Sequence, residues 1–183
     1  SAKLSLFFFL NHMKSQARVV VIGGGVVGCS VLYHLTKAGW KDVVLVERDR
    51  LTSGSTWHAA GGFHTLNGDP NVAKLQGYTI GLYDELEKIS GQACGLHRSG
   101  GLILADTPER LEWLKMAHAR AKYLGLETEM MSMKEAKALN PLLEEKYFVG
   151  AMLDAADGNL DPEGTTHAYA KSARIAGAEI YQN

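Results

Sequence analysis

The stretch Arg18-Val-Val-Val-Ile-Gly-Gly-Gly-Val-Val-Gly28 decides the fold of this chain. Its apolar run Val19–Ile22 ends at a glycine, which predicts a parallel strand buried on both faces. Gly23 permits a tight turn, Gly25 lets a pyrophosphate approach the backbone, and Gly28 lets helix and strand pack closely. The start of the following helix would stabilise the anion without any charged side chain.

A second strand and an acidic residue complete this pattern. The helix that starts at about Val26 should end at Gly39, and the apolar run Val43–Val46 then predicts a parallel strand. Glu47 follows it, about 20 residues beyond the glycines, where a carboxylate accepts hydrogen bonds from ribose hydroxyls and repels a 2′-phosphate. The order predicts a dinucleotide site and argues against NADP, but Glu47 alone does not separate NAD from FAD.

Composition narrows the class of protein. The chain has 183 residues, 46% of them hydrophobic, so it can bury the core of one domain or of one domain and part of another. A formal net charge of −1 without a basic stretch predicts no nucleic-acid or membrane partner. Cys29 and Cys94 form no CxxC pair, so we expect a reducing compartment, the cytoplasm or, in a eukaryote, the mitochondrial matrix.

The first 17 residues are expected to be a leader or an artefact. Their apolar run Leu4–Leu10 is far shorter than the roughly 20 residues of a membrane span. No small-residue cleavage site follows it, which argues against a signal peptide. We interpret Met13 as the natural start and residues 1–12 as an upstream artefact, with a short organellar leader as the alternative.

Further along, helical and strand patterns alternate with turn signals. Residues 51–70 are too polar and glycine-rich for a regular element and predict a long loop. The chain stops in a strand just after a helix, so we expect the N-terminal piece of a longer protein. The other expected elements are a helix over 71–90, a strand over 100–105, a helix from Thr107 to Gly125, a short helix between the capping box Ser132–Glu135 and Pro141, a strand over 148–153, a helix over 161–176 ended by Gly177, and a strand over 178–181.

A second motif, Gly54-Ser-Thr-Trp-His-Ala-Ala-Gly-Gly62, lies inside the predicted loop. Its small residues let a bulky group approach the backbone, Ser55 and Thr56 offer hydroxyls, and Trp57 and His58 offer ring faces. These properties predict a loop that cradles a cofactor. The alternative is a flexible glycine loop in which His58 is solvated or hydrogen-bonded.

The segments GGGVVG, VVLVER and LTSGSTWHAAGG together resemble the dimethylglycine and sarcosine dehydrogenase family of D-amino-acid-oxidase-like flavoproteins. The segment Asp157-Gly-Asn-Leu-Asp-Pro162 is similar to the DGxxDP segment of that family, so the resemblance spans nearly all of residues 18–182. It implies an α/β fold in which a Rossmann-like FAD-binding domain, residues 18–70 and 155–183, is interrupted by part of an α+β substrate domain, residues 71–154.

The resemblance also implies the positions of the cofactor site. The family histidine that carries covalent FAD corresponds to His58, Val26 and Val27 would lie beside the pyrophosphate, and Glu47 and Arg48 at the adenosine. Gly62 departs from the family, which often has leucine there. The expected cofactor-binding residues are Gly23, Gly25, Val26, Val27, Gly28, Glu47, Arg48, Gly54, Ser55, Thr56, Trp57, His58, Ala59, Ala60, Gly61 and Gly62.

The activity implied is oxidative demethylation of an N-methyl amino acid such as dimethylglycine or sarcosine. Oxygen or an electron-transfer flavoprotein would accept the electrons, and tetrahydrofolate would bind in the missing C-terminal part. No catalytic base is assigned. Two alternatives stay open, namely an amino-acid oxidase with non-covalent FAD and a non-catalytic regulatory member of the family.

Other polar residues have simpler interpretations. Four of the histidines outside the motif are too scattered for a metal site and are expected to be surface or satisfied polar groups. Asp157 and Asp161 are interpreted as a turn residue and a helix cap rather than a catalytic pair. The three methionines near position 131 are expected to fill core space. The four scattered histidines are His64, His97, His118 and His167.

Overall fold

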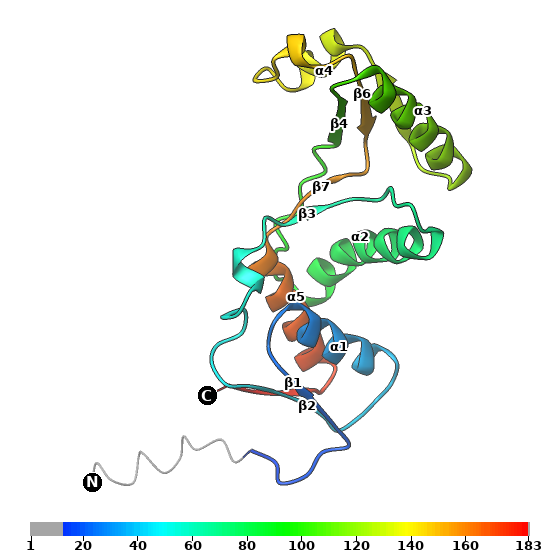
Figure 1. Cartoon of the computed structure of the whole chain (residues 1–183). Helices are drawn as coiled ribbons and strands as arrows, with labels where there is room; N and C mark the ends of the chain where they lie inside the picture. The colour runs from blue at the N-terminus through cyan, green and yellow to red at the C-terminus, as the bar shows by residue number, and fades with distance from the viewer. Residues whose placement is uncertain (1–12, 183) are drawn as a thin grey trace. The chain divides into compact units, whose positions relative to one another are not determined.

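The computed structural model describes residues 13–182 and divides the chain into two compact units (Figure 1). One unit contains the residues up to Ala59, Leu86–Gln92 and the residues from Pro162 onward. The other contains Ala60–Glu85 and Ala93–Asp161. The sequence predicts the domain boundaries at residues 70 and 155. That one domain binds FAD and the other binds the substrate stays a prediction. The expected artefact, residues 1–12, lies outside the described residues.

The first unit is built around a parallel sheet whose strands, among the described residues, follow the order β1-β2-β8. Helices α1 and α5 pack against each other, with the rings of Tyr33 and Tyr169 in edge contact at 5.6 Å. This arrangement confirms the predicted α/β fold. The elements are β1 (Val19–Ile22), α1 (Val26–Lys37), β2 (Val43–Glu47), α5 (Pro162–Ile175) and β8 (Glu179–Gln182).

The prediction that the first strand is buried on both faces is wrong for the described residues. Val20 and Ile22 are 52% and 85% exposed, whereas Val19 and Val21 are half-buried. Alternate side chains of a strand point to opposite faces, so Val20 and Ile22 share one face of β1, and the described residues leave that face largely uncovered. An unbroken apolar run does not reveal which face is covered.

The second unit contains an antiparallel sheet in the order β4-β6-β5. A core of Ala105, Leu114 and Met152 lies between this sheet and α3, and a second core around Ala136 and Ala151 involves α4. A two-stranded ladder, β3 with β7, joins the residues after the glycine loop to the segment after β6. The elements are β3 (Gly62–Phe63), β4 (Gly101–Ala105), α3 (Pro108–Tyr123), β5 (Thr128–Met131), α4 (Met133–Leu139), a 3₁₀ turn (Glu145–Tyr147), β6 (Gly150–Asp154) and β7 (Gly158–Asn159).

Helix α2 (Pro70–Ser90) begins in the second unit and ends in the first. Each unit also holds one buried cysteine outside any disulfide, Cys29 in the first and Cys94 in the second. Burial is the main reason that the pKa of the Cys29 thiol is raised to about 12. Both cysteines therefore belong to the packed interior.

Local signals place most helix ends correctly. Thr107 accepts a hydrogen bond from the Arg110 N–H at 3.2 Å, and Ser132 and Glu135 form the predicted capping box. Strand β5 was not expected, and a 3₁₀ turn (Thr56–His58) and β3 interrupt the predicted loop over 51–70. These elements are two to four residues long, too short for hydrophobic periodicity to identify.

The substitution Gly28→Ala should lower the free energy of unfolding of the intact protein by at least about 3 kcal/mol, because overpacking displaces backbone. A Cβ at Gly28 would lie only 1.9 Å from the Gly23 carbonyl oxygen. Gly81→Ala is the matched control, since a Cβ there meets nothing within 4 Å inside α2. We expect it to stabilise by about 0.5–1 kcal/mol. Equal denaturation midpoints for the two variants would contradict this account.

Candidate functional site

The glycine turn between β1 and α1 has the geometry of an anion site. Gly23 has φ +106°, a conformation that favours glycine, and its N–H donates to the Val46 carbonyl at 2.9 Å. Helix α1 begins at Val26 after Gly25, with no side-chain cap and no acidic residue in its first turn. The positive end of its dipole is therefore not neutralised by a carboxylate of its own first turn.

Glu47 lies at the carboxyl end of β2 and contacts the same turn. Its Oε2 accepts a hydrogen bond from the Gly24 N–H at 2.6 Å, and its Oε1 accepts one from the Asp49 N–H at 3.0 Å. Each carboxylate oxygen has a further lone pair, so ribose hydroxyls can still donate to it. The neighbouring Arg48 is exposed.

A hydrogen bond joins the second motif to the start of α1. The buried Thr56 hydroxyl accepts from the Val26 N–H at 3.0 Å, and a Cβ on Gly25 would lie 3.0 Å from the same oxygen. Val26 and Val27 remain 37% and 74% exposed. The residue type of Thr56 predicts a hydroxyl that meets the cofactor, but no local signal in the sequence indicates this contact, because the partners are 30 residues apart.

His58 is exposed on the 3₁₀ turn, with its ring 3.8 Å from that of Trp57 between centroids. Its Nδ1 lies 3.3 Å from the Gly54 carbonyl oxygen. A carbonyl only accepts, so Nδ1 carries the hydrogen in this contact and Nε2 keeps its lone pair. The first unit thus contains the expected residues from Gly23 to Ala59, which follow the carboxyl ends of β1 and β2. Ser55 is exposed.

The remaining motif residues, Ala60, Gly61 and Gly62, belong to the second unit. There Gly62 pairs with Asn159 in the ladder between β3 and β7, and Gly61 accepts a hydrogen bond from the Leu160 N–H at 3.0 Å. The predicted set is therefore divided between the units. What these three residues contact in a bound cofactor stays a prediction.

Asp157 and Asp154 form a buried pair in the second unit. Asp157 accepts from the Thr65 N–H at 3.0 Å and lies 2.9 Å from His64 Nδ1. Asp154 accepts from the Thr65 hydroxyl at 2.8 Å, and burial raises the pKa of its carboxyl. The buried neighbour of Asp157 is thus Asp154, whereas Asp161 is exposed.

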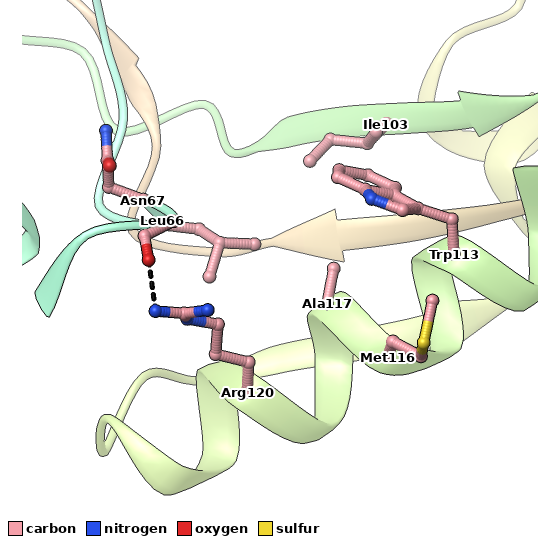
Figure 2. A pocket seen from close by; sticks show the side chains of 8 residues that line it. Leu66, Asn67, Ile103, Trp113, Met116, Ala117 and Arg120 are labelled. Atoms are coloured by element: carbon pink, nitrogen blue, oxygen red, sulfur yellow. Dashed lines mark hydrogen bonds between the residues drawn. The ribbon is translucent and has the colours of Figure 1, made fainter.

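Two pockets open in the second unit. The larger, of about 470 Å³, has an apolar floor, with Trp113 beside Ile103 and Arg120 donating to the Gly68 carbonyl (Figure 2). The smaller, of about 290 Å³, lies between β3 and α2 and includes His64. The larger pocket is lined by Leu66, Asn67, Gly68, Ile103, Trp113, Met116, Ala117 and Arg120. The smaller is lined by Gly62, Phe63, His64, Leu75, Gln76, Thr79, Ile80 and Tyr83.

Two kinds of feature are absent between residues 13 and 182. No group of three or more histidine, cysteine or acidic side chains there is arranged to hold a metal ion. No helix in that range has the length and apolar character needed to cross a membrane.

A family model described as FAD dependent oxidoreductase matches residues 18–183. The chain belongs to this family. It is 40% identical over 168 residues to mitochondrial dimethylglycine dehydrogenase of Homo sapiens, covering 92% of this chain and 19% of that protein. It is 39% identical over 172 residues to human mitochondrial sarcosine dehydrogenase, and this match covers 93% of this chain and 19% of that protein. The chain thus spans about a fifth of the length of these curated relatives.

A solved structure of L-proline dehydrogenase from P. horikoshii has the same fold, with a TM-score of 0.85 and 26% identity. The match covers 93% of this chain and 45% of that one. The residues present fit the FAD of this family, since a Cβ at Gly25 would lie 3.0 Å from Thr56 Oγ1 and one at Gly28 only 1.9 Å from the Gly23 oxygen, so the turn needs glycine at both positions, as a dinucleotide-binding turn does. In this FAD dependent oxidoreductase, α1 would hold the pyrophosphate and Glu47 the ribose.

The substitution Thr56→Val should lower the free energy of unfolding of the intact protein by about 1 kcal/mol, because the Val26 N–H loses its acceptor. Thr56→Ser keeps the hydroxyl and should stay close to wild type. Denaturant unfolding measures both variants. A valine variant as stable as the serine variant would exclude this hydrogen bond as a stabilising contact.

Asp154→Asn should change how stability depends on pH. Because burial raises the pKa of Asp154 in the folded state, its contribution is fully present below about pH 4 and is lost as the pH rises through that raised value. We therefore subtract the unfolding free energy of Asp154→Asn from that of wild type, and this difference should fall from pH 4 to pH 7. A constant difference across this range, measured by thermal unfolding, would refute this linkage.

Proposed function

We propose that the intact protein oxidises the C–N bond of a small N-methyl amino acid, of the dimethylglycine or sarcosine type, with FAD linked to His58. One observation carries this proposal. The motif that presents His58 is fixed through Thr56 to the start of α1, the same helix that would bind the pyrophosphate. The 39–40% identity to the two named dehydrogenases supports the substrate class.

The chain's own groups have separate tasks in this mechanism. The start of α1 would stabilise the negative charge of the pyrophosphate, and Glu47 would accept hydrogen bonds from the ribose hydroxyls. The Gly54 carbonyl accepts from Nδ1 of His58, which leaves Nε2 as the nucleophilic nitrogen for a covalent link. When bound, the flavin supplies the two-electron acceptor for the C–N bond. Water then hydrolyses the resulting iminium to the demethylated amine and an aldehyde, unless the one-carbon unit passes to tetrahydrofolate.

The electrons pass to oxygen or to an electron-transfer flavoprotein. In a eukaryote the compartment is the mitochondrial matrix, as the names of the two human relatives support, and in a bacterium it is the cytoplasm. Oxygen consumption, compared with reduction of an artificial electron acceptor, separates an oxidase from a dehydrogenase.

The His58 link is tested by the intact mass of the denatured full-length protein. Wild type should carry a mass increase equal to one FAD, and His58→Ala should lose it because the attacking nitrogen is gone. His97→Ala is the control, because it removes another exposed histidine outside the motif. FAD that is released on denaturation of wild type would replace the covalent proposal with a non-covalent oxidase. Covalent FAD without turnover of any amine would favour a regulatory role.

A further inference from the structure

His64 and Asp157 form an imidazole–carboxylate pair that the proposed function does not use. His64 Nδ1 lies 2.9 Å from Asp157 Oδ2. The carboxylate is 5% exposed, whereas the imidazole is 69% exposed. The acid is therefore held inside the second unit, and the ring that it contacts faces outward.

The hydrogen bonds determine which ring nitrogen is open. The other oxygen of Asp157, Oδ1, accepts from the Thr65 N–H at 3.0 Å. A carboxylate oxygen accepts, so Nδ1 of His64 is the donor in the contact with Oδ2, and Nε2 is the ring nitrogen left for a ligand. Gly101 makes room for this carboxylate, because a Cβ there would lie only 2.6 Å from Asp157 Oδ2. The Thr65 N–H thus orients the acceptor in the space that the glycine leaves.

The imidazole lines the smaller pocket of the second unit. This pocket, of about 290 Å³, has His64 and the last motif residue, Gly62, on one wall and α2 on the other. The opposite wall combines the apolar Leu75 and Ile80 with the polar Gln76 and Thr79, and Tyr83 lines the pocket from the same helix. Burial raises the pKa of the Tyr83 hydroxyl, which favours its neutral form. The pocket therefore combines room for a small ligand with a basic nitrogen.

We propose that His64 is a substrate-facing base, positioned by Asp157, that takes the ammonium proton of an amino-acid substrate. The inference rests on the proposed function for its reaction. Aliphatic amines have a pKa of about 10, so the substrate nitrogen is protonated at pH 7 and has no lone pair. Its N–H bond breaks, the electron pair stays on nitrogen, and the proton forms a new N–H bond at Nε2. The Asp157 carboxylate balances the imidazolium charge.

The test uses full-length protein with wild type, His64→Asn and the control His97→Gln. The asparagine amide takes the place of Nδ1 and keeps a donor toward Asp157 while removing Nε2. We expect kcat/KM for sarcosine to fall about 100-fold at pH 7, the scale of general-base catalysis. The loss should shrink to less than tenfold at pH 10, where solvent supplies the neutral amine. His97→Gln should match wild type at both values.

Asp157→Asn tests the positioning role. It should lower kcat/KM by about tenfold at pH 7, with the same recovery at pH 10, because the imidazole remains but loses its orientation. A purely structural role would lower the rate equally at both pH values, and that result would overturn the positioning of His64 by Asp157. A loss below twofold in His64→Asn, or one that is equal at both pH values, would overturn the base.

Calorimetric binding of sarcosine to the dithionite-reduced protein gives a readout that does not depend on turnover. Removing an acceptor for a charged donor should weaken binding about tenfold in His64→Asn. Equal affinities, or no binding to a wild type that oxidises sarcosine, would overturn the inference. If wild type oxidises other amino acids but no N-methyl substrate, and His64→Asn shows the same pH-dependent loss, the proposed substrate class fails and the base stands.

Discussion

The first unit depends on how closely α1 approaches the turn after β1. Gly28 has no side chain, and a Cβ at this position would lie only 1.9 Å from the Gly23 carbonyl oxygen. The close packing of Gly28 on Gly23 fixes the start of α1. There the Val26 N–H donates a hydrogen bond to the Thr56 hydroxyl. The motif that carries His58 is thus held by the same helix end that the glycines position.

Local chemistry accounts for the parts of the fold that the sequence predicts. Glycines with positive φ end helices at Gly39 and Gly177, and a capping box starts α4, because each signal acts over a few residues. Strand β5 escaped prediction because its four residues gain stability from pairing with β6, whose residues lie 20 to 26 positions further along the chain. The exposure of β1 likewise depends on neighbours that its own residues do not specify.

The candidate site is likewise only partly predictable from the sequence. Its residue types and spacing are visible in the sequence, since glycines, a strand-end acid and a Thr-Trp-His segment have recognisable chemistry. The contacts between them are not, because Gly24 meets Glu47 across 23 residues and His64 meets Asp157 across 93. A pattern of turn dipeptides at Asp157 therefore concealed a buried acid with an imidazole partner.

The two cysteines give each unit its own reporter of opening. Cys29 lies in the core of the first unit and Cys94 in that of the second, and neither thiol is accessible in the native structure. A thiol reagent can therefore react with each only when the surrounding unit opens. The rate at which each cysteine is alkylated would measure the local stability of its own unit, without any mutation or label introduced into the protein.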